Sequence, residues 1–500
     1  MANKSLIIIG AGVAGLTAGC YGQMNGYATQ IFEMDSKPGG LCTAWERKSY
    51  TIDGCLEWLV GTSPNSTFHR FWEELGVLQG KEILNLEQFC RVEGENGEAF
   101  TLFTNVDFLE QHMKDLAPKD TAFIEEFAKA VRHFASFEPP IEKAPELHST
   151  MDNLKMLSKM RPFMGDLQKW GKMSMKDFAL RFENPFLREA FQEIWPPELS
   201  CLAFIFTLAW LSQKNAGYVI GGSRAIARSM EERYLNLGGK VNYNSKVTKI
   251  QVENNRATGV LLENGSEHKA DCVISASDGH ATIFDLLEGK YVDKTIRGYY
   301  DSMPIFQPVI YLALGVKRSF NDVPKTVSGV VLLLDKPIKI AGKEHKHLRV
   351  HIYNYDSSFA PAGKTVLTLM LESDFAYWDS LSKDSVRYNA EKAMIAHDVI
   401  FALNKRFPGL AENVEMSDVA TPYTFYRYTG NWQGSYEGWL PTPENMRLQM
   451  KKTLPGLDNF YMIGQWVSPG GGLPSGLITG RHVIQLLCAR DKKKFTASTP

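Results

Sequence analysis

The stretch SLIIIGAGVAGLTAGCYGQMNGYATQIFEMD, residues 5–35, combines two apolar runs, a glycine-rich turn and a closing acidic pair. Residues 5–9 are rich in β-branched side chains, which is typical of a strand buried on both faces. Three glycines follow with the spacing G-x-G-x-x-G: Gly10, Gly12 and Gly15. This spacing allows a tight turn, close approach of a pyrophosphate and close packing of a helix, which we expect to begin near Val13. The free N–H groups of that helix would face the phosphates.

Glu33 ends the second predicted strand, 23 residues after Gly10. A carboxylate at this place accepts hydrogen bonds from the two ribose hydroxyls of an adenosine. No arginine follows at Met34 or Asp35, so a 2′-phosphate is disfavoured and the motif predicts FAD or NAD rather than NADP. A tight turn without a ligand is the structural alternative.

Composition limits the class of protein. The chain has 500 residues, of which 44% are hydrophobic, so it can bury large cores and form about three domain equivalents. The formal net charge of −1 gives no basic field for nucleic acid, and we predict no such partner. The histidines lack metal-ligand spacing, so no metal site is predicted. The glycine motif starts within ten residues of Met1 and leaves no room for a signal peptide, so a cytoplasmic location is expected.

The chain pattern is interleaved rather than serial. It predicts an α/β fold in which a Rossmann-like dinucleotide-binding domain alternates with an α+β substrate domain. The largely helical segment is too long to be a loop and is interpreted as an inserted subdomain. The expected parts are nucleotide-binding segments at 1–70, 215–285 and 419–490, a helical subdomain at 71–214, a sheet-containing substrate domain at 286–418 and a solvated tail at 491–500.

Two apolar or mixed segments bear on membranes. Residues 201–211 form an apolar helical run of eleven residues, whereas crossing a bilayer needs about twenty, so a buried helix is predicted. Residues 154–176 mix Lys and Arg with Met, Phe and Trp, a composition that suits peripheral contact with a membrane surface. Pro162 would interrupt a helix there. The alternative is an ordinary surface element in which methionines fill gaps in the core.

A second motif lies near the C-terminus, NFYMIGQWVSPGGGLPSGLITGRHVIQLL, residues 459–487. It predicts a strand at 460–463, a loop at 470–472 and a helix to Leu487, with Pro474 in a first turn that tolerates proline. Another helix N-terminus is thus delivered to the nucleotide site. Aimed at a flavin, its dipole would stabilise the negative charge of the reduced ring, which NAD does not need.

Taken together, the Gly10-x-Gly12-x-x-Gly15 turn with Glu33, the Gly39-Gly40 pair, the KVTKI strand around Val247 and the closing GGGLPSGLITGR resemble the FAD-dependent amine oxidase-like superfamily. Within it, the chain looks most like the phytoene desaturase, carotenoid isomerase and retinol saturase branch. The resemblance extends over nearly the whole length. Its motifs are specific for FAD and much less specific for substrate.

The resemblance implies a set of cofactor-binding residues. Glu33 would bind the adenosine ribose, and the backbone of Val247 would lie beside the adenine. The remaining residues would lie along the pyrophosphate, the ribityl chain and the flavin ring: Gly10, Gly12, Ala14, Gly15, Gly39, Gly40, Leu41, Gly464, Gly472, Leu473, Pro474 and Gly476.

Two positions depart from the pattern of the family. Many relatives carry Arg directly after the Gly-Gly pair, where this chain has Leu41, so one phosphate contact is missing or supplied elsewhere. Related members often have His in D-x-G-x-H, where this chain has Glu57 in DGCLE. Transfer of the acid–base role of that histidine to Glu57 is an open hypothesis.

The resemblance implies desaturation, saturation or flavin-assisted cis/trans isomerisation of C–C bonds in a polyene, isoprenoid or unsaturated lipid. Such chemistry needs a long apolar pocket and one or two positioned proton donors. Glu57, Tyr426 and Tyr428 are the candidates, although each could have a purely structural role. No motif indicates the electron partner.

Two other classes of protein stay open. A flavin amine oxidase shares the FAD scaffold and surrounds its flavin with an aromatic cage, for which Trp432, Tyr436 and Trp439 are available. A non-catalytic protein that escorts prenylated partners also resembles this fold. The intact glycine turns, Glu33 and the closing motif argue against it, because a scaffold without flavin need not keep all three.

Overall fold

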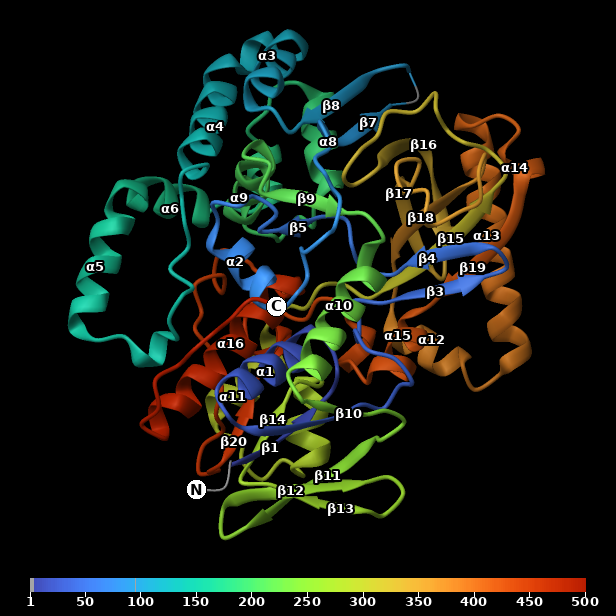
Figure 1. Ribbon diagram of the computed structural model, residues 1–500. Coiled ribbons are helices and arrows are strands. Elements are labelled where there is room, and N and C mark those ends of the chain that lie inside the picture. Colours follow the sequence, from blue (N-terminus) through green and yellow to red (C-terminus); the bar gives the residue numbers. More distant parts are fainter. Residues whose placement is uncertain (1–3, 95) are drawn as a thin grey trace.

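The computed structural model describes residues 4–94 and 96–500, and a five-stranded parallel sheet lies in its nucleotide-binding part (Figure 1). The strand order is β10 (Lys240–Asn242), β2 (Ala28–Phe32), β1 (Ser5–Ile9), β14 (Cys272–Ser275) and β20 (Phe460–Met462). Three distant stretches of the chain therefore build one sheet. The α/β, Rossmann-like fold predicted from the sequence is confirmed.

Both faces of this sheet are covered, as the apolar run in β1 predicts. Leu6 and Ile8 pack in one cluster with α1 (Val13–Met24), α10 (Gly222–Asn236) and α16 (Gly472–Arg490). Ile7 and Ile9 point to the other face and pack beneath the meander of β11 (Val247–Glu253), β12 (Arg256–Leu262) and β13 (Glu267–Lys269). Figure 1 shows the helices above the sheet and the meander below it.

A seven-stranded sheet forms the second large layer. Its order is β19 (Val414–Ala420), β15 (Val309–Val316), β18 (Thr365–Glu372), β17 (Lys343–Ile352), β16 (Val330–Ile340), β7 (Gln88–Glu93) and β8 (Ala99–Phe103). The long helix α13 (Ser385–Arg406) packs on this sheet through Ile395, Val399 and Leu403.

The edge of this sheet includes a hairpin from the stretch that was expected to be largely helical. Residues 88–103 fall in the stretch expected to be largely helical, yet they form the hairpin β7–β8, and β7 pairs in parallel with β16. Gly97, with φ +82°, makes the tight connection possible. The strands form because β16, more than 200 residues away in the chain, offers them an edge.

Residues 106–212 are largely helical. The helices α3 (Val106–Leu116), α4 (Thr121–Phe134), α8 (Pro185–Ile194) and α9 (Cys201–Ser212) share an aromatic-rich core, and α9 is the buried helix predicted from its apolar run. Pro162 lies in a 3₁₀ turn between α5 (Thr150–Met160) and α6 (Met164–Gly171), which confirms the predicted interruption. Within the described chain, every helix is too short or too polar to span a bilayer.

Shorter elements connect these layers. They are α2 (Thr67–Glu74), α7 (Met175–Ala179), α11 (Lys294–Ser302), α12 (Phe375–Leu381), α14 (Leu410–Asn413), α15 (Pro422–Thr429), β3 (Ala44–Arg47), β4 (Tyr50–Asp53), β5 (Leu59–Val60), β6 (Ile83–Leu84) and β9 (Ala216–Val219).

The tail at 491–500 is mostly exposed, and Asp491 and Phe495 are its half-buried residues. The ring of Phe495 lies 5.7 Å from that of Tyr21, and the Arg481 guanidinium lies 4.8 Å from the Phe495 ring centre. Further along, Arg233 donates a hydrogen bond of 2.7 Å to the carbonyl of Ser498. The polar composition of the tail does not predict that Phe495 packs against the body of the protein.

Candidate functional site

The first glycine turn lies at the carboxyl end of β1, between β2 and β14. Gly10 has φ +98°, which favours glycine. A Cβ at Gly15 would lie 1.9 Å from the Gly10 carbonyl oxygen, so any side chain there would push α1 away from the turn. Carboxyl ends of parallel strands are where nucleotides bind in such sheets.

Glu33 follows β2 directly and lies beside this turn with 7% of its surface exposed. Its Oε2 accepts a 2.6 Å hydrogen bond from the N–H of Ala11, and its Oε1 accepts one of 2.9 Å from the N–H of Asp35. Burial raises the pKa of Glu33, and these backbone donors oppose the shift. The carboxyl oxygens keep further acceptor capacity for ribose hydroxyls.

The segment after β10 wraps around Glu33. The Glu33 N–H donates to the carbonyl of Asn242 at 2.9 Å, and the Ser245 N–H donates to the carbonyl of Glu33 at 2.7 Å. Val247, 7% exposed, begins β11 two residues later. The structure therefore brings Val247 to the same end of the site as Glu33.

The second glycine pair packs against the first turn. The Gly39 N–H donates to the carbonyl of Ala11 at 2.9 Å, and a Cβ at Gly40 would lie 3.4 Å from the Cα of Gly12. Both glycines have positive φ, +116° and +61°. Leu41, half-buried, comes next and offers no charge to a phosphate.

The closing motif reaches the same place from the far end of the chain. A Cβ at Gly476 of α16 would lie 3.1 Å from the N of Ala14, and one at Gly464 would lie 3.6 Å from the Ala14 Cβ. The Gly464 N–H also donates to the hydroxyl of Thr479 at 2.8 Å. The helix begins at Gly472, and Leu473 and Pro474 lie half-buried in its first turn. Glycine thus permits the close contact of α16 with α1.

These residues fit FAD. Two glycine turns let backbone segments approach each other closely at the carboxyl end of β1, and a buried carboxyl lies where a ribose binds in such sheets. The N-terminus of a second helix packs beside that of the first. The individual contacts predicted for the cofactor-binding residues stay predictions.

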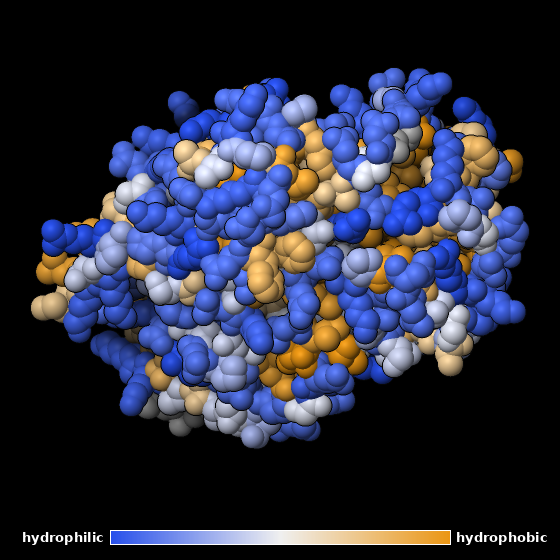
Figure 2. All heavy atoms as spheres, turned by 90° about the horizontal axis from the view of Figure 1, so that it is seen from above, coloured by the Kyte–Doolittle hydropathy of each residue, from blue (hydrophilic) through white to orange (hydrophobic). Residues whose placement is uncertain are grey.

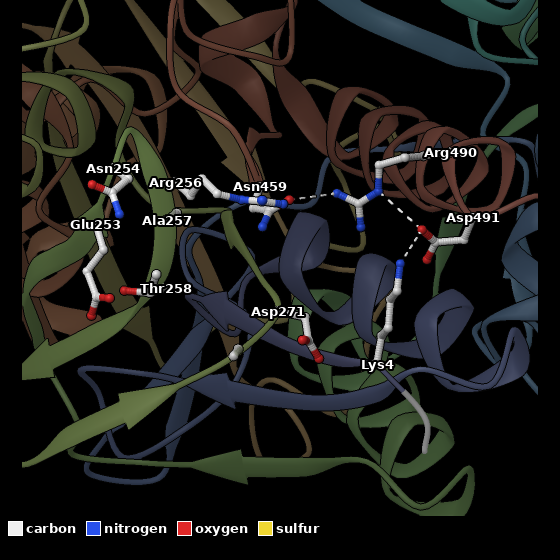
Figure 3. A pocket seen from close by; sticks show the side chains of 11 residues that line it. Lys4, Glu253, Asn254, Arg256, Ala257, Thr258, Asp271, Asn459, Arg490 and Asp491 are labelled. Carbon is white, nitrogen blue, oxygen red and sulfur yellow. Dashed lines mark hydrogen bonds and ion pairs between the residues drawn. The ribbon is translucent and has the colours of Figure 1, made fainter. Parts of the chain in front are cut away.

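A different cavity lies at the opposite edge of the sheet. It has a volume of about 630 Å³ and lies next to the N-terminal ends of β1, β14 and β20, where Lys4, Asp271 and Asn459 line it (Figure 3). Asp491 accepts from Lys4 at 2.6 Å, and the Arg490 guanidinium lies 3.3 Å from the Asp491 carboxylate. Because ligands of such sheets bind at the carboxyl ends of the strands, this mixed-charge surface cavity is not the cofactor site.

Among the proton-transfer candidates, Glu57 lies inside the protein, in the segment after β4. It is partly accessible, and burial raises the pKa of its carboxyl, while the Ser328 hydroxyl and the Arg349 guanidinium oppose the shift. Three tyrosines lie in the same region: Tyr218, Tyr311 and Tyr355. The negative charges of Asp53 or Glu57 help to raise the pKa of each.

Tyr426 and Tyr428 do not reach this region. They lie on α15 with 44% and 53% of their surfaces exposed, the Tyr426 ring packs against Phe375, and the Arg427 guanidinium lies over the Tyr428 ring. This exposure argues against the proton-transfer role predicted for both tyrosines. Proximity in sequence to the closing motif is a poor guide here, because only Pro422 of α15 is buried and both tyrosine side chains lie at the surface.

An acid at this site that the sequence prediction did not name is Glu437. It lies half-buried beside Gly472 at the start of α16, and the charge of Glu57 acts on its carboxyl. The only sequence signal is a single acid among aromatic residues in GSYEGW, residues 434–439. Burial of that acid depends on segments that are distant in the sequence.

Comparison with known proteins gives the family. Residues 13–487 match the family of flavin-containing amine oxidoreductases, and the chain belongs to this family. With the fit of the site described above, the protein is an FAD-dependent oxidoreductase or isomerase.

Curated relatives extend over nearly the whole chain. It is 24% identical to a phytoene desaturase (lycopene-forming) of Paracoccus sp., over 97% of each chain. It is also 24% identical to the chloroplastic prolycopene isomerase of Daucus carota, over 95% of this chain and 78% of that protein. A 4,4′-diapolycopene oxygenase of Methylomonas sp. is 23% identical over 97% of this chain and 98% of its own.

Solved structures share the fold. An oxidoreductase from Methanosarcina mazei has a TM-score of 0.60 at 17% identity, covering 97% of this chain and 99% of that one. Cyclohexylamine oxidase from Brevibacterium oxydans has a TM-score of 0.59 at 13% identity, covering 98% and 100%. These likenesses concern the fold alone.

Proposed function

We propose that the protein acts on C–C bonds of a long, apolar, unsaturated molecule of the polyene, isoprenoid or lipid class, by desaturation, saturation or cis/trans isomerisation. The observation that carries this proposal is the full-length similarity to a phytoene desaturase and a prolycopene isomerase, together with the intact flavin cradle. Bound FAD would supply the hydride acceptor or donor for such a reaction.

Glu57 is the proposed proton-transfer group of the chain. Its raised pKa favours the protonated carboxyl, which can donate, and the Arg349 guanidinium can stabilise the carboxylate after donation. Glutamate and histidine can both move a proton, so Glu57 can serve where related members carry histidine.

An amine oxidase is the second candidate. Tyr436 is half-buried at the site, but Trp439 is completely buried and packs with Trp466 at a ring distance of 5.1 Å. Trp432 stacks on His280. Two of the three aromatic residues suggested for a cage thus pack within the protein, which favours the C–C bond reaction. A non-catalytic protein that escorts prenylated partners is disfavoured, because both glycine turns, Glu33 and the closing motif are present.

We also propose peripheral contact with a membrane surface through α5. None of the residues of α5 is buried, and Met151, Leu154 and Leu157 are each more than half exposed. Lys155 and Lys159 lie on the same helix and are exposed. In the view from above, hydrophobic and hydrophilic side chains adjoin at the left edge, where α5 lies in Figure 1 (Figure 2). Exposed aliphatic and basic side chains together suit an anionic lipid surface, from which an apolar substrate can be drawn.

Anaerobic incubation of the purified holoprotein with phytoene, prolycopene, putrescine or cyclohexylamine tests the function. Bleaching of the flavin absorbance by phytoene, or a change in the chromatographic isomer pattern of prolycopene, is the expected result. Bleaching by an amine, with both polyenes unchanged, would move the protein to the amine oxidase class.

A further inference from the structure

Glu437 crosses the N-terminal end of α16, where the glycine run makes room for it. A Cβ at Gly471 would lie 1.9 Å from the Glu437 carbonyl oxygen, and a Cβ at Gly472 would lie 3.1 Å from the Glu437 Oε1. Both glycines have positive φ, +48° and +66°. The carboxyl is therefore fixed beside the first turn of the helix that Gly476 holds against the start of α1.

The carboxyl of Glu437 has no partner in residues 4–94 and 96–500: neither a hydrogen bond nor an ion pair reaches it. Burial raises its pKa to about 8, and the nearby charge of Glu57 adds to the shift. Its side chain is nevertheless partly accessible. Burial without a hydrogen-bond partner favours the protonated, neutral form of this carboxyl.

The groups that interact electrostatically with Glu437 add no cation to it. Cys55 and Tyr436 face it, and the charge of Glu437 raises the pKa of both. The positive charge of Arg349 opposes the rise in the pKa of Glu57 and of Tyr436. It does not offset the rise in the pKa of Glu437. The dipole of α16 favours a carboxylate, but no N–H of the helix donates to Glu437, so burial and the charge of Glu57 dominate.

We propose that Glu437 is a second catalytic carboxyl of the flavin site, a neutral acid that exchanges a proton with the substrate carbon next to the one that exchanges hydride. This inference rests on the proposed function. Two buried carboxyls within electrostatic reach do not ionise together, so one keeps its proton while the other titrates. Glu437 is the member without a cation.

The proposed step balances for each reaction. In saturation, the C=C bond gains hydride from the reduced cofactor and a proton from Glu437, which becomes a carboxylate and is reprotonated from solvent. Desaturation runs the same transfers in reverse, with the oxidised cofactor accepting the hydride. In isomerisation, Glu437 adds a proton to the polyene and takes one back, without net redox change.

The pH dependence of unfolding tests the proton on Glu437 independently of activity. The pKa of Glu437 in the folded protein lies above its ordinary value of 4.5, so its stabilising effect is complete below pH 4.5 and is lost as the pH rises to about 8. Within this window, the unfolding constant of wild type relative to Glu437→Gln should rise about tenfold per pH unit, measured by urea denaturation of the holoprotein. Glu444→Gln, at an exposed site, is the matched control and should track wild type. Parallel curves for wild type and Glu437→Gln would overturn the proposal.

Turnover of the polyene tests the catalytic role. Glu437→Gln should lower kcat about 100-fold or more and remove the upper limb of the pH profile, while the Kd of FAD changes less than about threefold. Glu437→Asp should restore part of the rate. Wild-type turnover by Glu437→Gln would overturn the catalytic role. If wild type converts no polyene, the proposed function and this role fail together, whereas the unfolding experiment still decides whether Glu437 holds a proton.

Discussion

At the scale of single residues, Glu33 shows how one carboxyl can serve the fold and the cofactor together. Its Oε2 holds the N–H of Ala11 inside the glycine turn, and the same group lies where a ribose would bind. Glu33→Gln keeps the shape but loses the charge, so the Kd of FAD should rise about 10- to 100-fold, the effect of losing a charge-assisted hydrogen bond. Fluorescence titration of the flavin-free protein with FAD measures this change.

Asp35→Asn is the control for Glu33→Gln. Asp35 is a neighbouring acid, but its Oδ1 accepts from the N–H of Ser36 and is exposed. The control should bind FAD within about twofold of wild type. Equal Kd values for both variants would show that Glu33 acts only through the shape of the turn.

The sequence predicts the positions of the glycine turn and of Glu33 better than it predicts which side chains gather around Glu57. Gly10, Gly15 and Glu33 follow local rules, because a tight turn and a strand end fix their places within about 25 residues of chain. Tyr426 and Glu437 do not follow such rules, since exposure of the first and burial of the second depend on how α15 and α16 pack on distant segments. Spacing in sequence carries no information about that packing.

At the scale of elements, α5 combines exposed aliphatic and basic side chains on a helix that has no fully buried residue and packs on the core only through Met160 at its end. Binding to anionic lipid should scale with the buried apolar area and with about 1 kcal/mol for each basic side chain near the surface. The double change Leu154→Asp with Leu157→Asp should therefore reduce binding to phosphatidylserine-containing vesicles at least tenfold in a co-sedimentation assay. The melting temperature should stay within a few degrees, since neither side chain is buried.

A matched pair on another helix controls for general surface polarity. Val386 and Phe401 of α13 are 77% and 66% exposed and lie on a different element. Their double change to Asp should leave vesicle binding unchanged. If this control loses binding as strongly as the α5 variant, or if wild type does not sediment with the vesicles, α5 is not a lipid-contacting helix.

The elements that the sequence predicts correctly are those with their own local signals. Pro162 marks the end of α5, and the apolar run from Cys201 predicts a buried helix. The hairpin β7–β8 was missed because its stability depends on pairing with β16, a contact between residues 91 and 330. Strands that join a sheet from a distant part of the chain depend on their neighbours more than on their own residues.

At the scale of the whole molecule, a buried ion pair joins α2 to α16 within the nucleotide-binding part. Arg481 of α16 pairs with Glu74 of α2, and both side chains are less than one-tenth exposed. The Tyr21 hydroxyl of α1 donates to the same carboxylate at 2.5 Å, and Phe71 and Phe495 lie against the guanidinium. Four segments from both ends of the chain thus meet at one charge pair, close to the helices that build the flavin site.

Removing one member of this pair should destabilise the protein strongly. Glu74→Gln leaves the Arg481 guanidinium buried without a carboxylate, which costs about 3–5 kcal/mol of the free energy of unfolding, measured by urea denaturation. Glu73→Gln, on the same helix but 42% exposed, should cost no more than about 0.5 kcal/mol. Replacing both partners by Leu should recover much of the loss, because no unpaired charge is then left in the core. Equal free energies of unfolding for Glu74→Gln and Glu73→Gln would contradict this prediction. They would mean that water reaches Arg481 and that α1, α2 and α16 pack less tightly there than the structure shows.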